Sequence, residues 1–306
     1  MAEYPIIPII CGPTASGKTA VTVELAEDFS IEVVSADSRQ IIRRLDIGTA
    51  KPTREEREQV PVHLVDLIEP GERYSAFRFI SDATRVIGEI IERGNQPIVV
   101  GGTGLYLRAL TEGVVEIENE DMSVRERLDQ EWDDEGGEKM HARLAGIDPL
   151  EAAKIHPNNK QRVIRALEIF YLTGKTKSEI ITTGAHFKSP YRFEYFCLAP
   201  DRTELYEHIN ARVDQMMSDG LLDELQALVR EGLSSQIRGA NVIGYSELLN
   251  YIDGITDLDE AVALIKQNTR RFAKRQMTWF RGQPECTFYR DKKSLREALN
   301  LLLLQR

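Results

Sequence analysis

The stretch that most constrains the fold of this chain is Gly12-Pro13-Thr14-Ala15-Ser16-Gly17-Lys18-Thr19, which fits the phosphate-loop pattern G-x-x-x-x-G-K-[ST]. The apolar run Ile6–Cys11 before it predicts a buried strand, and Ala20–Phe29 after it predicts a helix. In such a loop the glycines let backbone amides turn toward phosphate oxygens, and the helix N-terminus adds a partial positive charge. Strand, loop and helix in this order argue against a chance glycine turn, so we expect a site for a di- or triphosphate.

Two side chains of this loop carry its expected chemistry. Lys18 supplies a mobile cation, and Thr19 supplies a hydroxyl for a magnesium ion (Mg2+) that is bound through the phosphate. The loop alone leaves open which compound binds, ATP and other nucleotides included, and what happens to it.

The composition is that of an ordinary globular protein. The chain has 306 residues, of which 42% are hydrophobic and 29% charged, and this length suggests one large domain or two smaller ones. Its three cysteines, Cys11, Cys197 and Cys286, form no metal-ligand spacing, which favours a reduced, cytoplasmic setting. No basic n-region begins the chain and no apolar run approaches a membrane span, so we expect neither a signal peptide nor a membrane partner.

The first third of the chain alternates strand and helix patterns, which predicts a parallel sheet with helices on both faces. Further strands are predicted at Glu32–Ser35, His63–Ile68 and Ile98–Val100, and further helices at 76–93, with Ser75 as its cap, and from Leu105. Between them, Ser38–Thr53 is polar and is predicted to be an ordered loop. Ligands in such sheets bind beyond the carboxyl ends of the strands, so Asp37, which follows the second strand, is expected near the phosphate loop.

The pattern changes near Glu116, where an acidic stretch begins. Ten acidic residues face two basic ones between Glu116 and Glu135, and from there to about Thr183 the periodicity is helical, without a convincing strand. The sheet is predicted to resume at Arg192–Leu198, and later elements follow as helices at 205–218, 221–230, 246–251, 258–281 and 295–304 and a strand at Cys286–Tyr289. We therefore predict an α/β, P-loop NTPase-like core at 1–115 and 187–306 and an inserted all-helical domain at 116–186.

The charges are unevenly distributed. The chain carries a net charge of −10, which by itself argues against a nucleic-acid partner. However, seven basic residues face one acidic residue between Lys266 and Arg290, and five face one between Lys160 and Lys177. Two basic segments on an acidic protein suggest a local polyanion site, although solvated helix faces would explain the charges equally well.

Several motifs, in order along nearly the whole chain, closely resemble those of the bacterial tRNA dimethylallyltransferases, also called tRNA isopentenyltransferases. They are GPTASGKT at Gly12–Thr19, ADSRQ at Ala36–Gln40, LDIGTAKP at Leu45–Pro52, GGTGLYLRAL at Gly101–Leu110, NKQRVIRALE at Asn159–Glu168, INARVDQMMSDGLLDEL at Ile209–Leu225, IGY at Ile243–Tyr245 and FAKRQMTWFR at Phe272–Arg281. The phosphate loop alone is unspecific, but the combination is highly specific. The chain departs from the family pattern at Ile42, usually an aromatic residue, and at Val62, usually the first of two histidines.

The resemblance implies that dimethylallyl diphosphate is the donor and that the acceptor is the exocyclic amine of the adenosine 3′ to the anticodon, in tRNAs that read UNN codons. The phosphate loop would then hold the pyrophosphate leaving group. Asp37 matches the family's general base, and Lys18, Thr19 with Mg2+, Thr103 and Arg212 would hold the pyrophosphate. A helix or loop cap is the ordinary alternative for Asp37, and a surface ion pair is the ordinary alternative for Arg212.

The resemblance also implies a set of tRNA contacts. An anticodon-loop base must be flipped out of its stack before it can reach Asp37. Candidates for contacting this base or the anticodon stem-loop are Asp37, Ser38, Arg39, Gln40, Thr103, Arg125, Gln161, Arg162, Val163, Ile164, Arg165, Lys274 and Arg275. We expect the protein to act as a monomer.

Three other functions remain open from the sequence. A small-molecule or nucleoside kinase would use the same loop, with Asp37 as the base for a hydroxyl. An adenylate isopentenyltransferase would use the same fold but would not need two basic segments. A non-enzymatic, nucleotide-gated RNA-binding protein would leave Asp37 without a role.

Overall fold

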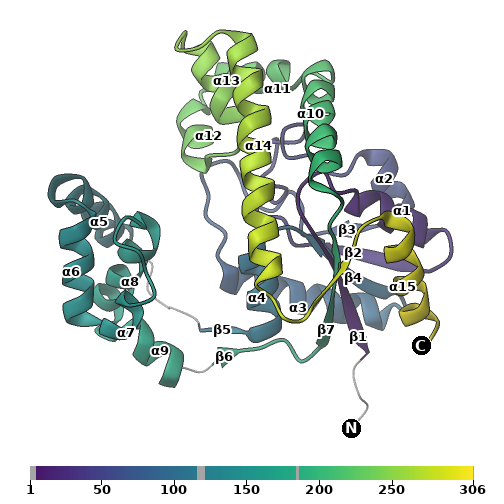
Figure 1. Ribbon diagram of the computed structural model, residues 1–306, viewed down its shortest axis with the longest axis horizontal. Coiled ribbons are helices and arrows are strands. Elements are labelled where there is room, and N and C mark those ends of the chain that lie inside the picture. Colours follow the sequence, from purple (N-terminus) through teal and green to yellow (C-terminus); the bar gives the residue numbers. More distant parts are fainter. Residues whose placement is uncertain (1–4, 116–120, 184–185, 306) are drawn as a thin grey trace. The chain divides into compact units, whose positions relative to one another are not determined.

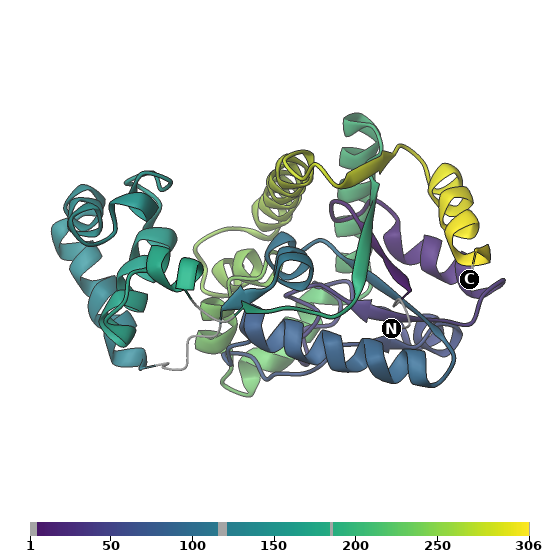
Figure 2. The ribbon, with the colours of Figure 1, turned by 90° about the horizontal axis from the view of Figure 1, so that it is seen from below.

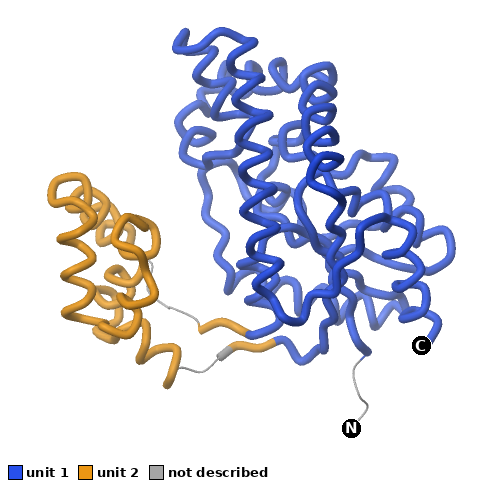
Figure 3. The backbone as a smooth tube through the Cα atoms, viewed as in Figure 1, with its two compact units in different colours: residues 1–112, 189–306 blue, residues 113–188 orange. Residues whose placement is uncertain are grey.

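The computed structural model describes residues 5–115, 121–183 and 186–305. The chain forms two compact units, one made of residues 1–112 and 189–306 and the other of residues 113–188 (Figure 3). Among the described residues, no helix has the length and apolar character that crossing a membrane requires.

The larger unit is built on a six-stranded sheet in which every paired strand runs parallel to its neighbour (Figure 1). Its order is β3 (Val62–His63), β2 (Ile31–Ser35), β4 (Gln96–Gly101), β1 (Ile6–Cys11), β7 (Arg192–Leu198) and β8 (Cys286–Tyr289). Cys11 is in register with Gly101 on one side and with Cys197 on the other. Because the strands are parallel, the loops that follow β1, β2 and β4 leave the sheet at one edge. The predicted α/β fold class is confirmed.

Helices cover both faces of the sheet (Figure 2). On one face, α1 (Lys18–Ala26) and α15 (Lys292–Leu304) share an apolar core with the strands. On the other, α3 (Ala76–Glu92) buries the apolar side that its helical spacing predicts. Ser75 caps α3 as predicted, since its side chain accepts a hydrogen bond from the Arg78 amide at 3.1 Å.

The third predicted strand, His63–Ile68, is wrong in extent, because β3 covers only Val62–His63. Leu64 and Asp66 have φ angles of +61° and +56°, which turn the chain out of the sheet. The Asp66 carboxylate is held by Lys51 at 2.6 Å and by Arg57 at 3.2 Å. Helix α2 (Arg54–Gln59), which carries Arg57, was not predicted, although Thr53 and Glu56 form the capping box that marks its start.

A layer of helices packs beyond the carboxyl edge of the sheet around a separate apolar core. It consists of α10 (Arg202–Ser218), α11 (Leu221–Arg230), α12 (Ser234–Ala240), α13 (Tyr245–Ile252) and α14 (Leu258–Arg281), of which α12 was not predicted. The predicted loop Ser38–Thr53 contains no helix or named strand and docks on this layer through its buried residues Ile41, Ile42 and Leu45.

Backbone amides of the docked loop donate hydrogen bonds to side chains of the helical layer. The Glu224 carboxylate accepts the amides of Asp46 and Ile47 at 3.2 and 3.1 Å, and the Tyr245 hydroxyl accepts the Gly48 amide at 3.1 Å. A Cβ atom at Gly48 would lie 2.4 Å from the Tyr245 ring, so glycine is needed for this close approach.

The smaller unit is a helical bundle with a short two-stranded ladder. It contains α5 (Met122–Glu135), α6 (Gly137–Ile147), α7 (Pro149–Ala152), α8 (Lys160–Thr173) and α9 (Lys177–Thr183), and β5 (Val114–Val115) pairs antiparallel with β6 (His186–Phe187). Helices α5, α6 and α8 share an apolar core in which Leu128, Met140 and Leu167 are fully buried. The two short strands were not predicted.

Candidate active site

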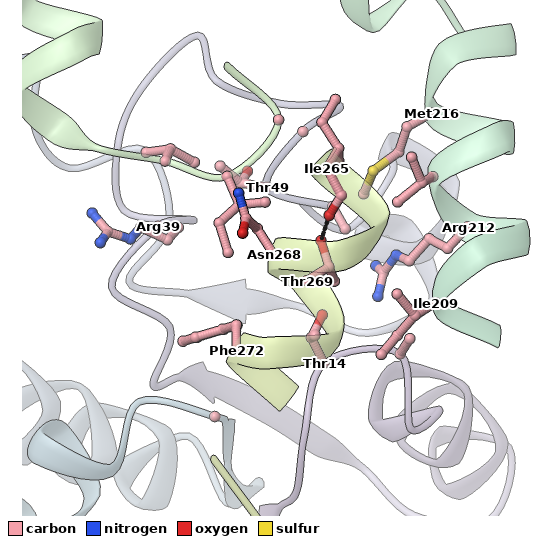
Figure 4. Close-up of a pocket in the computed structure, with 18 of the residues that line it drawn as sticks. Thr14, Arg39, Thr49, Ile209, Arg212, Met216, Ile265, Asn268, Thr269 and Phe272 are labelled. Atoms are coloured by element: carbon pink, nitrogen blue, oxygen red, sulfur yellow. Dashed lines mark hydrogen bonds between the residues drawn. The ribbon is translucent and has the colours of Figure 1, made fainter. Parts of the chain in front are cut away.

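A cavity of about 670 Å³ lies in the larger unit, at the carboxyl edge of the sheet. Its wall comes from the loops after β1, β2 and β4 and from helices of the layer above the sheet. Figure 4 shows Ile209, Arg212 and Met216 of α10 on the side opposite Thr269 and Phe272 of α14. The cavity has an apolar part, formed by Ile209, Val213, Met216 and Ile265, and a strongly polar part at the phosphate loop.

The phosphate loop has the backbone conformation of an anion nest. Gly12 and Gly17 have φ angles of +140° and +98°, and Ala15 adopts +62°. A Cβ atom at Gly12 would lie 2.3 Å from the Leu198 carbonyl oxygen, so only glycine fits there. The buried Ser16 hydroxyl has no hydrogen-bond partner among the described residues. A buried polar atom without a partner is costly, and a phosphate oxygen in the loop would supply one.

Two cations that have no carboxylate partner among the described residues face this loop. Lys18 donates to the carbonyl oxygens of Gly12 and Pro13 at 3.0 and 2.8 Å. Burial, with a smaller contribution from Arg212, lowers the pKa of Lys18 to about 8, although Asp37 opposes the shift. Burial also lowers the pKa of Arg212, while Asp37 and Glu56 act in the other direction. Within the described residues no carboxylate lies at ion-pair distance from Lys18 or Arg212, so both are available to an anion.

Asp37 follows β2 and lines the same cavity. Its Oδ1 atom accepts the amide of Arg39 at 2.8 Å and, less closely, that of Gln40 at 3.4 Å. No described donor hydrogen-bonds to Oδ2, which leaves this oxygen able to accept a proton. The Thr103 hydroxyl accepts the Ser38 amide at 2.9 Å and therefore fixes the backbone next to Asp37.

A buried glutamine, which the sequence reasoning missed, joins two of the loops at this edge. Gln276 on α14 accepts the Thr14 amide through Oε1 at 2.9 Å and donates through Nε2 to the Gly102 carbonyl oxygen at 3.0 Å. Helical spacing places Gln276 on the same face as Ala273 and Phe280, both fully buried. A polar residue on the apolar face of a basic helix was the signal that could have identified it.

The family model described as IPP transferase matches residues 40–283, and the one described as isopentenyl transferase matches residues 5–65. The chain belongs to the IPP transferase family. The resemblance seen in the motifs is thereby confirmed.

Two bacterial tRNA dimethylallyltransferases are similar to this member of the IPP transferase family over most of their length. The tRNA dimethylallyltransferase 1 of Pelobacter propionicus is 47% identical over 281 residues, which cover 92% of this chain and 91% of that protein. The tRNA dimethylallyltransferase of Geobacter metallireducens is 45% identical, with 90% of each chain covered.

Solved structures of the family are similar as well. The tRNA isopentenylpyrophosphate transferase of Bacillus halodurans is 42% identical and superimposes with a TM-score of 0.70 over 98% of this chain and 96% of that one. A eukaryotic dimethylallyltransferase, described as acting on tRNA, is 29% identical and superimposes with a TM-score of 0.77 over 94% of this chain and 74% of that one.

In this IPP transferase, the predicted site residues of the larger unit divide into two groups. Those that line the cavity are Thr14, Ala15, Gly17, Lys18, Thr19, Asp37, Arg39, Gln40, Arg212 and Arg275. Those that support its wall or lie outside it are Gly12, Pro13, Ser16, Ser38, Thr103 and Lys274. The side-chain carboxamide of Gln40 is already hydrogen-bonded within its own loop, because Nε2 donates to the Ala50 carbonyl oxygen at 2.9 Å.

The predicted site residues of the smaller unit lie on α5 and α8. Val163 and Ile164 are fully buried in the core of that unit, so their side chains are not exposed for a contact with tRNA. Arg125 and Arg165 both hold the buried Glu168, at 3.3 and 2.9 Å.

The neighbouring residues of α8 differ in what they contact. Arg162 lies 3.6 Å from the buried Glu151, whereas Gln161 is exposed. Three of the predicted tRNA-binding arginines, Arg125, Arg162 and Arg165, therefore also have a structural role.

The donor atoms at the phosphate loop fit a phosphate-bound magnesium ion. Among the described residues, no cluster of three His, Cys, Asp or Glu side chains could hold a metal by itself. Thr19 is exposed on the cavity wall next to Lys18. Mg2+ usually keeps several waters and binds through one or two protein oxygens plus substrate phosphates, and a single hydroxyl beside an anion nest matches that mode.

Proposed function

We propose that this protein transfers the dimethylallyl group of dimethylallyl diphosphate to the exocyclic amine of the adenosine 3′ to the anticodon, in tRNAs that read UNN codons. The observation that carries the proposal is the placement of one carboxylate, Asp37, and one anion nest on the same cavity as Lys18 and Arg212, two cations that pair with no carboxylate of the described residues. Membership of the IPP transferase family and the names of the relatives support the same activity.

The reaction forms one bond and breaks one. The adenine amine nitrogen attacks the first carbon of the dimethylallyl group, the bond from that carbon to the diphosphate oxygen breaks, and diphosphate leaves with the electron pair. The amine is a poor nucleophile because its lone pair is delocalised into the ring, so removal of its proton assists the attack. Asp37 takes this proton, through the Oδ2 atom that accepts no other hydrogen bond from the described residues.

The phosphate loop supplies the other half of the catalysis. The negative charge that develops on the leaving diphosphate is stabilised by the loop amides and by Lys18 and Arg212, whose pKa values burial lowers. Mg2+, when bound through Thr19, neutralises part of the diphosphate charge. Thr103 acts through Ser38 and holds the Asp37 backbone in place.

The tRNA contacts extend the proposal. The flipped adenosine enters between Asp37 and the diphosphate, next to Arg39 and Gln40, and the cost of flipping is offset by contacts to the stem-loop. We assign these contacts to Lys274 and Arg275 of α14 and to the helical domain at 116–186, through the exposed Gln161, Arg162 and Arg165 and through Arg125. A monomer in the cytoplasm is part of this proposal.

One assay separates the candidate activities. The protein is incubated with Mg2+, labelled dimethylallyl diphosphate and either unmodified tRNA or AMP. We expect label in tRNA, and digestion should place it on the adenosine 3′ to the anticodon. Label in AMP alone would establish an adenylate isopentenyltransferase, and phosphorylation of a metabolite from ATP would establish a kinase. Binding of tRNA without transfer of label would leave only an RNA-binding protein.

A further inference from the structure

Gln276 is a buried polar residue that connects three segments at the catalytic edge of the sheet. It is 8% exposed, it lines the cavity, and both ends of its carboxamide are hydrogen-bonded, to the Thr14 amide at 2.9 Å and to the Gly102 carbonyl oxygen at 3.0 Å. The side chain thus links α14 to the phosphate loop after β1 and to the loop after β4.

We infer that Gln276 is a positioning residue that sets the geometry of the phosphate loop for the diphosphate. This inference rests on the proposed function and adds to it a residue that holds the loop from α14, the helix that also carries the proposed tRNA contacts Lys274 and Arg275. No substrate contact is assigned to Gln276.

The Thr14 amide shows why the loop depends on this contact. A phosphate loop binds through backbone amides, so the direction of each N–H group determines how well the loop fits an anion. Thr14 lies between the two left-handed positions Gly12 and Ala15, and Gln276 fixes the direction of its N–H group. Loss of that acceptor would let the peptide rotate and would misalign the neighbouring amides.

Two glycines that follow β4, one in the loop and one at the start of the next helix, make room for this contact. A Cβ atom at Gly102 would lie 2.3 Å from Gln276 Nε2, and one at Gly104 would lie 2.5 Å from the Trp279 ring. Helix α14 therefore approaches the sheet closely at these two positions. The close approach places the carboxamide within reach of both loops.

Apolar side chains provide the packing of α14 against the rest of the unit. The apolar residues Ala261, Ile265, Ala273 and Phe280 anchor the helix, and all four are buried. The polar contacts of Gln276 are directed instead at two backbone groups next to the cavity. This division of roles separates loop positioning from the general stability of the helix.

The test compares two variants of Gln276 with a matched control. Binding of inorganic diphosphate with Mg2+ is measured by calorimetry, and steady-state transfer is measured with dimethylallyl diphosphate and tRNA. Gln276→Leu should weaken diphosphate binding about tenfold and lower kcat by a similar factor, because two hydrogen bonds next to the loop are lost, while KM for tRNA stays within about twofold. Gln267→Leu, on an exposed position of the same helix, should change neither.

A second variant provides a readout that a purely structural role would not move. In Gln276→Glu the carboxylate can still accept the Thr14 amide but cannot donate to Gly102, and it adds a negative charge near the leaving group. Protonation makes the acid a near copy of the glutamine. Diphosphate affinity relative to the unmodified protein should therefore recover as the pH falls from 8 to below 6.

The outcomes separate this inference from the proposed function. Diphosphate binding by Gln276→Leu within twofold of the unmodified protein, or a Gln276→Glu ratio that does not change with pH, overturns the positioning role. The Gln276→Glu series decides the matter if Gln276→Leu does not fold. A tenfold effect on diphosphate binding in a protein that labels no tRNA would support the positioning role and contradict the proposed transfer.

Discussion

The cavity of the larger unit and the α8 surface of the smaller unit both carry basic side chains, but these side chains are paired differently. At the cavity, Lys18 donates to backbone carbonyls and to no other group that the structure describes, and burial lowers its pKa to about 8. On α8, Lys160 pairs with Asp133 at 2.7 Å, and this hydrogen bond raises its pKa. The cations in the cavity are held in an unfavourable environment, while Lys160, Arg162 and Arg165 on α8 lie beside acidic partners.

The difference shows how to separate an anion site from a merely basic segment. A buried cation without a carboxylate partner costs free energy, and it becomes favourable when an anion binds. Removing a cation that pairs with a buried carboxylate destabilises the fold, and such a cation contributes less to the binding of an anionic ligand. The sequence counts five basic residues between Lys160 and Lys177, yet the structure shows four of them, Lys160, Arg162, Arg165 and Lys177, beside acidic partners.

The largest effect is expected at Asp37, the carboxylate that lines the same cavity as Lys18 and Arg212. Asp37→Ala and Asp37→Asn should lower kcat by roughly 10³-fold or more, because neither can take the amine proton, while tRNA binding is retained. Single-turnover transfer and filter binding measure the two quantities. Asp214→Asn on α10, where the carboxylate is exposed and pairs with Lys266, is the matched control. It should leave both kcat and tRNA binding unchanged. Turnover of Asp37→Asn near the normal rate would refute the base assignment.

The next largest effect concerns the two cavity cations and their pH dependence. Lys18→Met and Arg212→Met should each weaken binding of inorganic diphosphate by about 10- to 100-fold, since a charged hydrogen bond is lost. Lys18 is protonated below its pKa of about 8, so above that pH a proton must be taken up on binding and affinity should fall by up to tenfold per pH unit.

Calorimetry between pH 7 and 9.5 measures this dependence. The Lys18→Met variant corrects for titration of the diphosphate itself and should lack the additional decline, whereas Lys274→Met should keep it. Equal pH profiles for Lys18→Met and the unmodified protein would show that Lys18 does not bind the diphosphate as a cation.

A stability measurement tests whether the paired arginines of the smaller unit stabilise its fold. Replacing Arg125 and Arg165 together by methionine should destabilise the smaller unit by about 2–3 kcal/mol, because the buried Glu168 then loses both partners. Amide hydrogen exchange in α5 and α8 reports this local effect. Arg212→Met should not lower the stability of the larger unit. A loss of comparable size there would contradict the view that Arg212 serves ligand binding and not the fold.

The smallest effect is expected on tRNA binding. Lys274 is exposed on α14, and no described carboxylate lies within ion-pair distance of it. Lys274→Ala should weaken tRNA binding a few-fold and reduce the slope of log K against log salt by about 1. Lys266→Ala, where the lysine is paired with Asp214 at 2.5 Å, should leave the slope unchanged. An unchanged slope in Lys274→Ala would place the RNA elsewhere.

Elements with a local signal could be predicted from the sequence. The bounds of β1, β7, β8, α11 and α14 agree with those read from apolar runs and helical periodicity. The end of strand β3 could not be predicted, because Leu64 takes a left-handed conformation there and Lys51 and Arg57 hold Asp66. Those partners come from other parts of the chain, and no pattern in residues 63–68 indicates them.

The site divides in the same way. Glycine spacing and a following helix are enough to define a phosphate loop, because the conformation that binds phosphate is a property of a few consecutive residues. Only the tertiary structure decided three other features of the site. It showed which cations lack a carboxylate partner among the described residues, that Val163 and Ile164 face a core, and that Gln276 joins two loops. Each of these depends on what lies opposite a side chain, and partners that are distant in the sequence meet only when the chain folds.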